Sequence, residues 1–324
     1  MKYKLLYYEN LNFLPETLNM MEEHFDIVRL QNPSFDQNEI LSEIEILLAP
    51  RNFKVNSEKI DLCSNLKVIA SPTIIALHVD CEYAKQKNIE VIFLGLEKSF
   101  LDTITATAEL TWGLVIAISR HIPAAHQSVM NYEWNGKKFG EFTPKMLSNM
   151  TIGIIGLGRL GSMVASYAKA FGMKVYYFSP NTQNTNYHKC DTLKELAGVS
   201  DIISIHAEHN ERTEKLIDAK FFNEMKKNSY IINTSRGELI DEDALLDALI
   251  NNKIAGAALD VLSGEFEKNF KQNLKQSQLI QYANNNDNLI ITPHYAGATY
   301  SAWEKTQMQL IKLVIKKIKE LKLK

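Results

Sequence analysis

The stretch from residue 151 to residue 179 constrains the fold of this chain more than any other. An apolar run, Thr151–Ile155, leads directly into the sequence Gly156-Leu-Gly-Arg-Leu-Gly161. A run with helical spacing follows, and a second apolar run covers Lys174–Phe178. Strand, glycine-rich turn, helix and strand in this order predict half of a βαβ unit of the kind that binds dinucleotides.

Each glycine of this turn has a steric role in such a unit. The first makes the tight turn, the second lets the backbone approach a pyrophosphate, and the third lets the helix pack closely on the strand. The N–H groups at the start of the helix then face the phosphates. The residues that we expect to bind a cofactor here are Gly156, Gly158, Arg159, Leu160 and Gly161.

The end of the second strand departs from the usual pattern. An acidic residue normally follows the glycines by about 20 residues and holds the ribose hydroxyls of NAD. Ser179 stands at this place. A carboxylate would repel a 2′-phosphate, whereas a serine can hydrogen-bond either that phosphate or an unmodified ribose. The residue therefore leaves both NAD and NADP open.

Length and composition limit the class of protein. A chain of 324 residues is long enough for two domains with separate cores. A net charge of -2 gives no reason to expect a nucleic acid or an acidic membrane as partner. The three cysteines are scattered, without metal-ligand spacing, which favours a reduced, cytoplasmic setting. No apolar run reaches the length of a membrane span.

Strand and helix signals alternate along both halves of the chain, which predicts parallel sheets covered on both faces. A long helix is expected from 100 to 119, a polar insertion from 266 to 288 with a short helix at 278–283, and an amphipathic helix from 308 to 324. We expect the apolar stripe of that last helix to pack on the first domain. Strands are expected at 3–8, 27–30, 44–49, 66–70 and 89–94, and then at 151–155, 174–178, 202–206, 230–233, 256–259 and 289–292.

Polar residues follow three of the later strands, at the edge where open α/β sheets bind ligands. Arg236 ends one strand, Asp260 and Glu265 follow the next, and His294 follows the last. Each has a structural alternative: a surface ion pair for the arginine, a solvated loop acid for the glutamate, and a capping role for the histidine.

The order of these residues resembles the D-isomer-specific 2-hydroxyacid dehydrogenase family over nearly the whole chain. The motifs that carry the resemblance are the glycine turn, Asn233-Thr-Ser-Arg-Gly237, Ala257-Ala-Leu-Asp-Val261 with Glu265, and Thr292-Pro-His-Tyr-Ala-Gly297. The resemblance implies two doubly wound parallel-sheet α/β domains. A Rossmann cofactor domain would cover 99–295, and a flavodoxin-like substrate domain would combine 1–98 with 296–324. It also implies a homodimer formed through the cofactor domain.

The resemblance further implies hydride transfer between NAD(P)H and a small 2-oxo acid, without a metal. His294 would be the general acid, Glu265 would orient its imidazole and favour the protonated ring, and Arg236 would bind the substrate carboxylate. Asp260 would support the nicotinamide carboxamide. The other positions that would border the cofactor are Thr107, His206, Thr234 and Gly297.

One loop departs from the family in a way that bears on activity. Ile74 and Ile75 stand where the substrate-carboxylate loop is expected to have a small residue and glycine. A β-branched residue resists positive φ and crowds a ligand. Either the turn is reshaped, or the substrate is unusual, or turnover is poor. The last case leaves open a cofactor-binding sensor or scaffold with the same fold.

Overall fold

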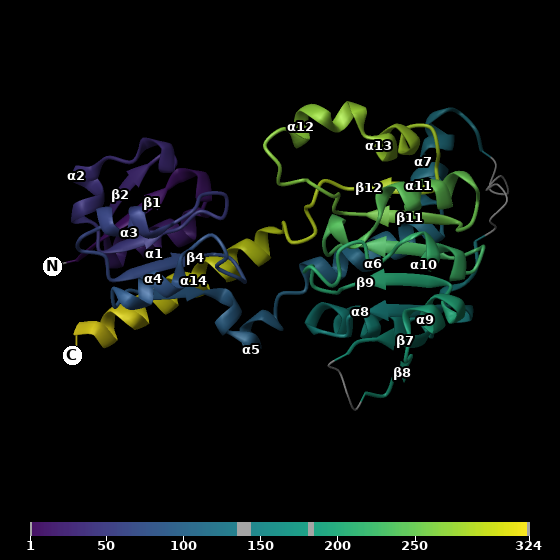
Figure 1. Ribbon diagram of the computed structural model, residues 1–324, viewed down its shortest axis with the longest axis horizontal. Coiled ribbons are helices and arrows are strands. Elements are labelled where there is room, and N and C mark those ends of the chain that lie inside the picture. The colour runs from purple at the N-terminus through teal and green to yellow at the C-terminus, as the bar shows by residue number, and fades with distance from the viewer. Residues whose placement is uncertain (1, 135–143, 181–184, 323–324) are drawn as a thin grey trace. The chain divides into compact units, whose positions relative to one another are not determined.

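The computed structural model describes residues 2–134, 144–180 and 185–322 (Figure 1). The chain divides into two compact units. Unit 1 combines Met1–Ile104 with Ala298–Lys324, and unit 2 is the continuous segment Thr105–Gly297. Each unit is built around one parallel sheet.

The sheet of unit 1 has five strands in the order β2-β1-β3-β4-β5, and every pairing is parallel. This is the flavodoxin-like strand order. Both faces are covered, so the expected fold class is confirmed for this half of the chain. The strands are β1 (Tyr3–Tyr8), β2 (Phe25–Leu30), β3 (Ile46–Leu48), β4 (Val68–Ser71) and β5 (Glu90–Phe93).

Successive residues of these strands point to opposite faces and so feed two different cores. Leu5, Ile46 and Val68 pack with α1 (Pro15–His24) and α14 (Tyr300–Lys322). Their neighbours Leu6, Leu47 and Ile69 belong to the core on the opposite face. That second core also takes residues from α2 (Asn38–Glu43), α3 (Ser57–Leu62) and α4 (Cys81–Gln86).

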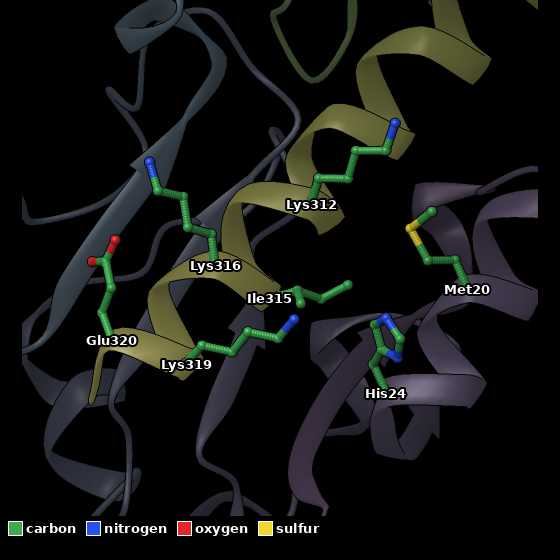
Figure 2. A pocket seen from close by; sticks show the side chains of 7 residues that line it. All are labelled: Met20, His24, Lys312, Ile315, Lys316, Lys319 and Glu320. Atoms are coloured by element: carbon green, nitrogen blue, oxygen red, sulfur yellow. The ribbon is translucent and has the colours of Figure 1, made fainter. Parts of the chain in front are cut away.

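The C-terminal helix packs on unit 1, as expected. The side chains that it buries there are Leu310, Ile311, Val314 and Ile318. Its solvent side is basic, and Lys312, Lys316 and Lys319 are among the residues that line a groove of about 430 Å³ between α1 and α14. Figure 2 shows Lys319 extending toward His24 of α1, whereas Lys316 extends to the other side of α14. The helix begins earlier than the apolar stripe predicts, because Thr299 Oγ1 accepts a hydrogen bond from Ala302 N (3.2 Å).

The sheet of unit 2 has seven parallel strands in the order β12-β11-β10-β9-β6-β7-β8. Counted outward from β6, this is the Rossmann order with one strand added. The two-residue strand β8 was not expected, because His188 and Lys189 form no apolar run. Both residues are exposed in the structure. The strands are β6 (Thr151–Ile155), β7 (Lys174–Phe178), β8 (His188–Lys189), β9 (Ile202–Ile205), β10 (Tyr230–Asn233), β11 (Gly256–Leu259) and β12 (Leu289–Ile291).

Helices cover both faces of this sheet (Figure 1). One core includes residues of α6 (Ala106–Ser119) and α8 (Arg159–Ala170). The other includes residues of α9 (Leu193–Val199), α10 (Ala219–Glu224), α11 (Glu242–Ile250) and α13 (Gln278–Ala283). The insertion between residues 266 and 288 contains α13, as expected, and also α12 (Phe270–Asn273).

The prediction of one long helix from 100 to 119 is wrong. The chain forms α5 (Lys98–Leu101), then turns, and α6 begins only at Ala106. Thr103 causes part of this break, because its hydroxyl donates to Phe100 O (2.8 Å) at the end of α5. By length and composition, Lys98–Ser119 could cross a membrane. Ala108, Val115 and Ile118 of α6 are instead buried in the core of unit 2.

Candidate active site

The glycine turn between β6 and α8 has the steric features that the sequence predicts. Gly156 has φ of 89°, and a Cβ there would lie 2.8 Å from Ala207 N. A Cβ on Gly161 would lie 2.2 Å from Gly156 O, so the helix packs against the turn itself. At Gly158 a Cβ would meet no atom within 4 Å. The free space therefore lies at the position expected to face a pyrophosphate.

The first turn of α8 adds donors to this space. Gly158 is the N-cap residue, and no side chain of the described residues caps the helix there. The first N–H groups of an α-helix point out of its end, which for α8 is the end at Gly158. A glycine turn with open space in front of a helix N-terminus fits a diphosphate.

Ser179 and His206 flank the glycine turn on the neighbouring strands. Ser179 follows β7 and is only 8% exposed, and the adjacent Phe178 O accepts a hydrogen bond from Gly156 N (2.9 Å). His206 follows β9, and its Nε2 lies 2.8 Å from Ser204 Oγ. Burial lowers the pKa of His206 to about 4, so its ring is neutral at physiological pH.

Three further residues of the expected cofactor site lie near the start of α6. Thr234 is buried, and its hydroxyl lies 2.7 Å from that of Thr111. Thr111 Oγ1 in turn donates to Thr107 O (2.7 Å). A Cβ on Gly297 would lie 3.8 Å from Thr107 Oγ1. The structure thus brings together Thr107, Thr234 and Gly297, which are far apart in the sequence.

Arg236 lies on a short turn that Asn233 organises. The Asn233 side chain donates from Nδ2 to Arg236 O (2.8 Å) and accepts at Oδ1 from Ser235 N (3.0 Å). The Arg236 guanidinium is partly exposed and donates from one nitrogen to Ser235 O (2.6 Å). Because guanidinium carries five N–H groups, donors remain for a carboxylate. This bracing role of Asn233 was not predicted from the sequence.

Asp260 is the centre of a buried hydrogen-bond network. It is 1% exposed, and its carboxylate accepts from Thr292 Oγ1 (2.6 Å), Tyr295 N (3.1 Å) and Ala296 N (2.9 Å). Its backbone oxygen accepts from His294 N (2.8 Å). Asp260 therefore fixes the loop that carries the histidine, a role that the sequence alone did not suggest.

His294 and Glu265 form the polar pair of this edge. His294 Nδ1 lies 2.6 Å from Glu265 Oε1, and the glutamate side chain is more buried than the imidazole (10% against 28% exposed). His294 adopts a left-handed φ of 50°. An ionised carboxylate only accepts hydrogen bonds, so Nδ1 carries the proton of the pair. Nε2 then remains for proton exchange with a ligand.

The arginine, the acids and the histidine follow β10, β11 and β12, which are adjacent in the sheet. The parallel arrangement brings their loops to one edge. Within the ranges that the structure describes, no group of three or more His, Cys, Asp or Glu residues could hold a metal ion. With the remaining donors of Arg236 and with Nε2 of His294, this edge can bind a carboxylate at Arg236 and exchange a proton at His294.

The loop after β4 in unit 1 has a different character. Ile74 and Ile75 are 49% and 50% exposed, and neither is among the residues with positive φ. The turn is held by Thr73, whose hydroxyl donates to Ile75 O (2.8 Å), and by Ser71 Oγ, which lies 3.1 Å from His78 Nε2. The isoleucines therefore cause no left-handed strain in this loop.

Comparisons with known proteins agree with the motifs. Residues 112–296 match the model of the D-isomer specific 2-hydroxyacid dehydrogenase NAD binding domain. A Staphylococcus haemolyticus protein named "Putative 2-hydroxyacid dehydrogenase" is 35% identical over 317 residues, which is 94% of each chain.

Solved structures are similar over almost the full length. An acyclic imino acid reductase in complex with NADPH and D-Arg has a TM-score of 0.77 at 29% identity, covering 98% of this chain and 97% of its own. D-Lactate dehydrogenase from Aquifex aeolicus, complexed with NAD and lactic acid, has a TM-score of 0.77 at 26% identity, covering 98% and 96%.

Proposed function

Because the chain belongs to the D-isomer specific 2-hydroxyacid dehydrogenase family, we propose that it transfers a hydride between NADH or NADPH and a small 2-oxo acid. Membership supports an oxidoreductase with a nicotinamide cofactor. The observation that carries the proposal is the 2.6 Å contact between His294 and Glu265 at the same sheet edge as Arg236. A capping histidine would not need a buried carboxylate partner.

The side chains have complementary tasks in this reaction. Arg236 binds the carboxylate of the 2-oxo acid through two N–H groups, while a third stays on Ser235 O. A reduced nicotinamide bound at this site would supply the hydride for the carbonyl carbon. His294 Nε2 donates the proton that the carbonyl oxygen then needs, and Glu265 stabilises the charged ring before that transfer. In the oxidation direction the neutral histidine accepts the hydroxyl proton.

The cofactor would lie along the carboxyl edge of the unit 2 sheet. Its diphosphate would meet Gly156, Gly158 and the N–H groups of Arg159, Leu160 and Gly161. Ser179 would contact the adenosine ribose or its 2′-phosphate. The nicotinamide half would be bordered by Thr107, His206, Thr234, Asp260 and Gly297. Both NADH and NADPH are compatible with a serine at position 179.

Unit 2 carries an apolar surface that supports the proposal of a homodimer. It lies on α7 (Ile122–Met130) and just beyond it, where Ile122, Val129, Met130 and Trp134 are between 40% and 91% exposed. Large exposed apolar patches mark association surfaces. Light scattering should give twice the monomer mass, and Val129→Glu should lower it. A wild-type protein with the mass of a single chain would contradict the homodimer. We expect the dimer to be cytoplasmic.

The direct test is oxidation of reduced cofactor by the purified protein. NADH and NADPH are supplied in parallel with a panel of 2-oxo acids, each with and without ammonium, because a similar structure is an imino acid reductase. Turnover of a 2-oxo acid without ammonium supports the proposal, and turnover only with ammonium contradicts it.

The second candidate is a cofactor-binding sensor or scaffold, and Ile74 with Ile75 is the feature that favours it. The large exposed side chains stand at the loop that would receive a substrate carboxylate. This candidate predicts tight NADH binding by fluorescence, with no turnover on any member of the panel. Turnover of any 2-oxo acid contradicts it.

A further inference from the structure

The turn that carries Glu265 is held by carboxylates from another part of the chain. Ser263 N donates to Glu242 Oε1 (2.7 Å), and the next amide, Gly264 N, donates to Glu238 Oε1 (3.4 Å). The bond internal to the turn, from Glu265 N to Leu262 O, is long at 3.4 Å. The shortest of these three restraints on the turn is therefore the one from Glu242.

Glu242 lies on a helix that is capped and anchored in the core of unit 2. It is the first residue of α11, whose N-cap Asp241 accepts from Ala244 N (3.3 Å). Leu245 and Leu249 anchor the helix with no exposed surface. By contrast, Ser263 is exposed, and Gly264 has a left-handed φ of 71°. A rigid helix end thus restrains an exposed turn.

The segment before α11 also fits closely against this turn. A Cβ on Gly237 would lie 2.0 Å from Leu262 C, so only glycine lets the two backbones meet. Leu262, Ser263 and Gly264 are thereby contacted in sequence by Gly237, Glu242 and Glu238. The three residues before Glu265 form one continuous contact with the η5–α11 corner, where η5 is the 3-10 turn Gly237–Leu239.

The charge of Glu242 has no cationic partner within the described parts of the chain, where no ion pair involves it. Burial raises the pKa of Glu242, and the hydrogen bond from Ser263 N opposes that rise. The nearby carboxylates Glu238, Asp243 and Asp241 raise it further. An acid in so unfavourable a place, bonded to a loop amide, acts on that loop rather than on a salt bridge.

We propose that Glu242 is a positioning residue, which holds the Ser263-Gly264 backbone so that Glu265 meets Nδ1 of His294. The catalytic part of this inference rests on the function proposed above for His294. Catalytic groups held slightly out of place lose much of their effect, so a restraint two residues from Glu265 matters for turnover. The restraint itself can be measured on the folded protein without any substrate.

The first experiment is amide hydrogen exchange. Glu242→Ala should speed exchange at Ser263 about tenfold or more, since the acceptor is lost. Glu242→Gln keeps an oxygen acceptor and should behave as wild type. Asp243→Ala is the matched control, because Asp243 is the exposed neighbour on the same helix turn. Unchanged exchange in Glu242→Ala would overturn the proposal, whatever the enzyme does.

The second experiment is a kinetic double-mutant cycle. Glu242→Ala should lower kcat about tenfold with little change in KM for the reduced cofactor, and Glu242→Gln should restore it. In a Glu265→Gln background, Glu242→Ala should have almost no further effect. Fully additive losses in kcat would mean that Glu242 acts on general stability, which contradicts the proposal.

The two experiments separate two kinds of failure. If the wild-type protein turns over no member of the panel, the proposed function fails. The exchange result then decides the positioning of Glu265 on its own.

Discussion

The two units have the same construction, a parallel sheet wound with helices, but their loops are fixed in different ways. In unit 2, the loops after β10 and β11 start from buried polar residues, Asn233 and Asp260, each with several hydrogen bonds. In unit 1, β4 ends on the buried Ser71, whose small hydroxyl contacts Ala49 O, Thr73 Oγ1 and His78 Nε2. The loop that follows exposes Ile74, Ile75 and Leu77. The parallel topology brings the loops to one edge of each sheet, and the two units differ in the polar group that ends the strand: an amide or a carboxylate in unit 2, and a single hydroxyl in unit 1.

The largest effect is expected at His294, which lies in the loops of unit 2 that buried polar residues hold. Replacement of His294 without loss of turnover would contradict the functional half of the comparison. His294→Ala removes the general acid, and we expect kcat to fall about 10³-fold, or about 4 kcal/mol in the activation free energy. Cofactor affinity, measured by the fluorescence of bound NADH, should stay within about threefold, because binding does not use that proton. Retained turnover in this variant would contradict the assignment.

Loop rigidity in unit 2 should depend on Asp260. Asp260→Ala leaves Thr292 Oγ1, Tyr295 N and Ala296 N without their acceptor, and we expect the free energy of unfolding to fall by about 3 kcal/mol. Urea unfolding measures it. Ser71→Ala is the counterpart in unit 1. Its hydroxyl donates to Ala49 O (3.2 Å) and also lies 3.1 Å from Thr73 Oγ1 and from His78 Nε2, and its loss should cost about 1 kcal/mol. Equal losses in the two variants would remove the contrast.

The buried polar edge of unit 2 should also give stability a pH dependence. The pKa of His206 is lowered by burial from 6.5 to about 4, so the unfolded chain binds a proton more readily than the folded one. The stability is present above pH 6.5 and is lost as pH falls toward 4, by about 2.5 kcal/mol at pH 4.5. His206→Gln should flatten this part of the stability curve, measured by urea unfolding. If the free energy of unfolding of His206→Gln falls with pH as steeply as that of the wild-type protein, other groups dominate the acid dependence.

Gly158 and Gly161 separate binding from packing within one turn. Gly158→Ala adds a methyl group to open space at φ of -84°, so stability should hold while NADH affinity falls about tenfold, or about 1.4 kcal/mol. In Gly161→Ala the same methyl group meets Gly156 O, so unfolding should become easier. Thermal unfolding and NADH titration of both variants test this. Unchanged NADH affinity in Gly158→Ala would move the phosphate site elsewhere.

The smallest effect is expected in the exposed loop of unit 1. Leu77 is 89% exposed, so Leu77→Ser should change the free energy of unfolding by less than about 0.5 kcal/mol. Urea unfolding checks it, with Leu48→Ala in the core as a control that should cost about 3 kcal/mol. A large loss at Leu77 would mean that this side chain is covered in solution.

The sequence predicts the sheets well where strands are continuous apolar runs. The strands of residues 151–155, 174–178 and 230–233 have the bounds that their runs of Ile, Val and Tyr predict. Such runs are typical of parallel strands buried on both faces. The strand at residues 188–189 and the break after Leu101 lack this signal. Both depend on hydrogen bonds, to Tyr176 and Tyr177 in the first case and from Thr103 in the second.

The candidate site was predictable as a set of residues but not as a network. Arg236, Glu265 and His294 could be selected from the sequence because each follows an apolar strand and because their order resembles that of the family motifs. The roles of Asn233 and Asp260 were not predictable, because their partners become neighbours only when strands pair. Asp260 reaches Ala296, 36 positions away, through the pairing of β11 with β12. For Glu242 likewise, the sequence indicates only an acidic residue that is favourable at the start of a helix.

The division of the chain has a consequence for the order of synthesis. Unit 2 is complete once Gly297 has been made, whereas unit 1 still lacks α14 at that moment. The side chains of Leu310, Ile311 and Val314 then close one face of the unit 1 sheet. The strands of unit 1, which are made before unit 2, therefore keep Leu5, Ile46 and Val68 only partly covered on that face until α14 is made. Unit 2 can therefore finish folding before unit 1, although most of unit 1 is made earlier, and a chain stopped short of α14 would expose part of an apolar sheet face to chaperones and proteases.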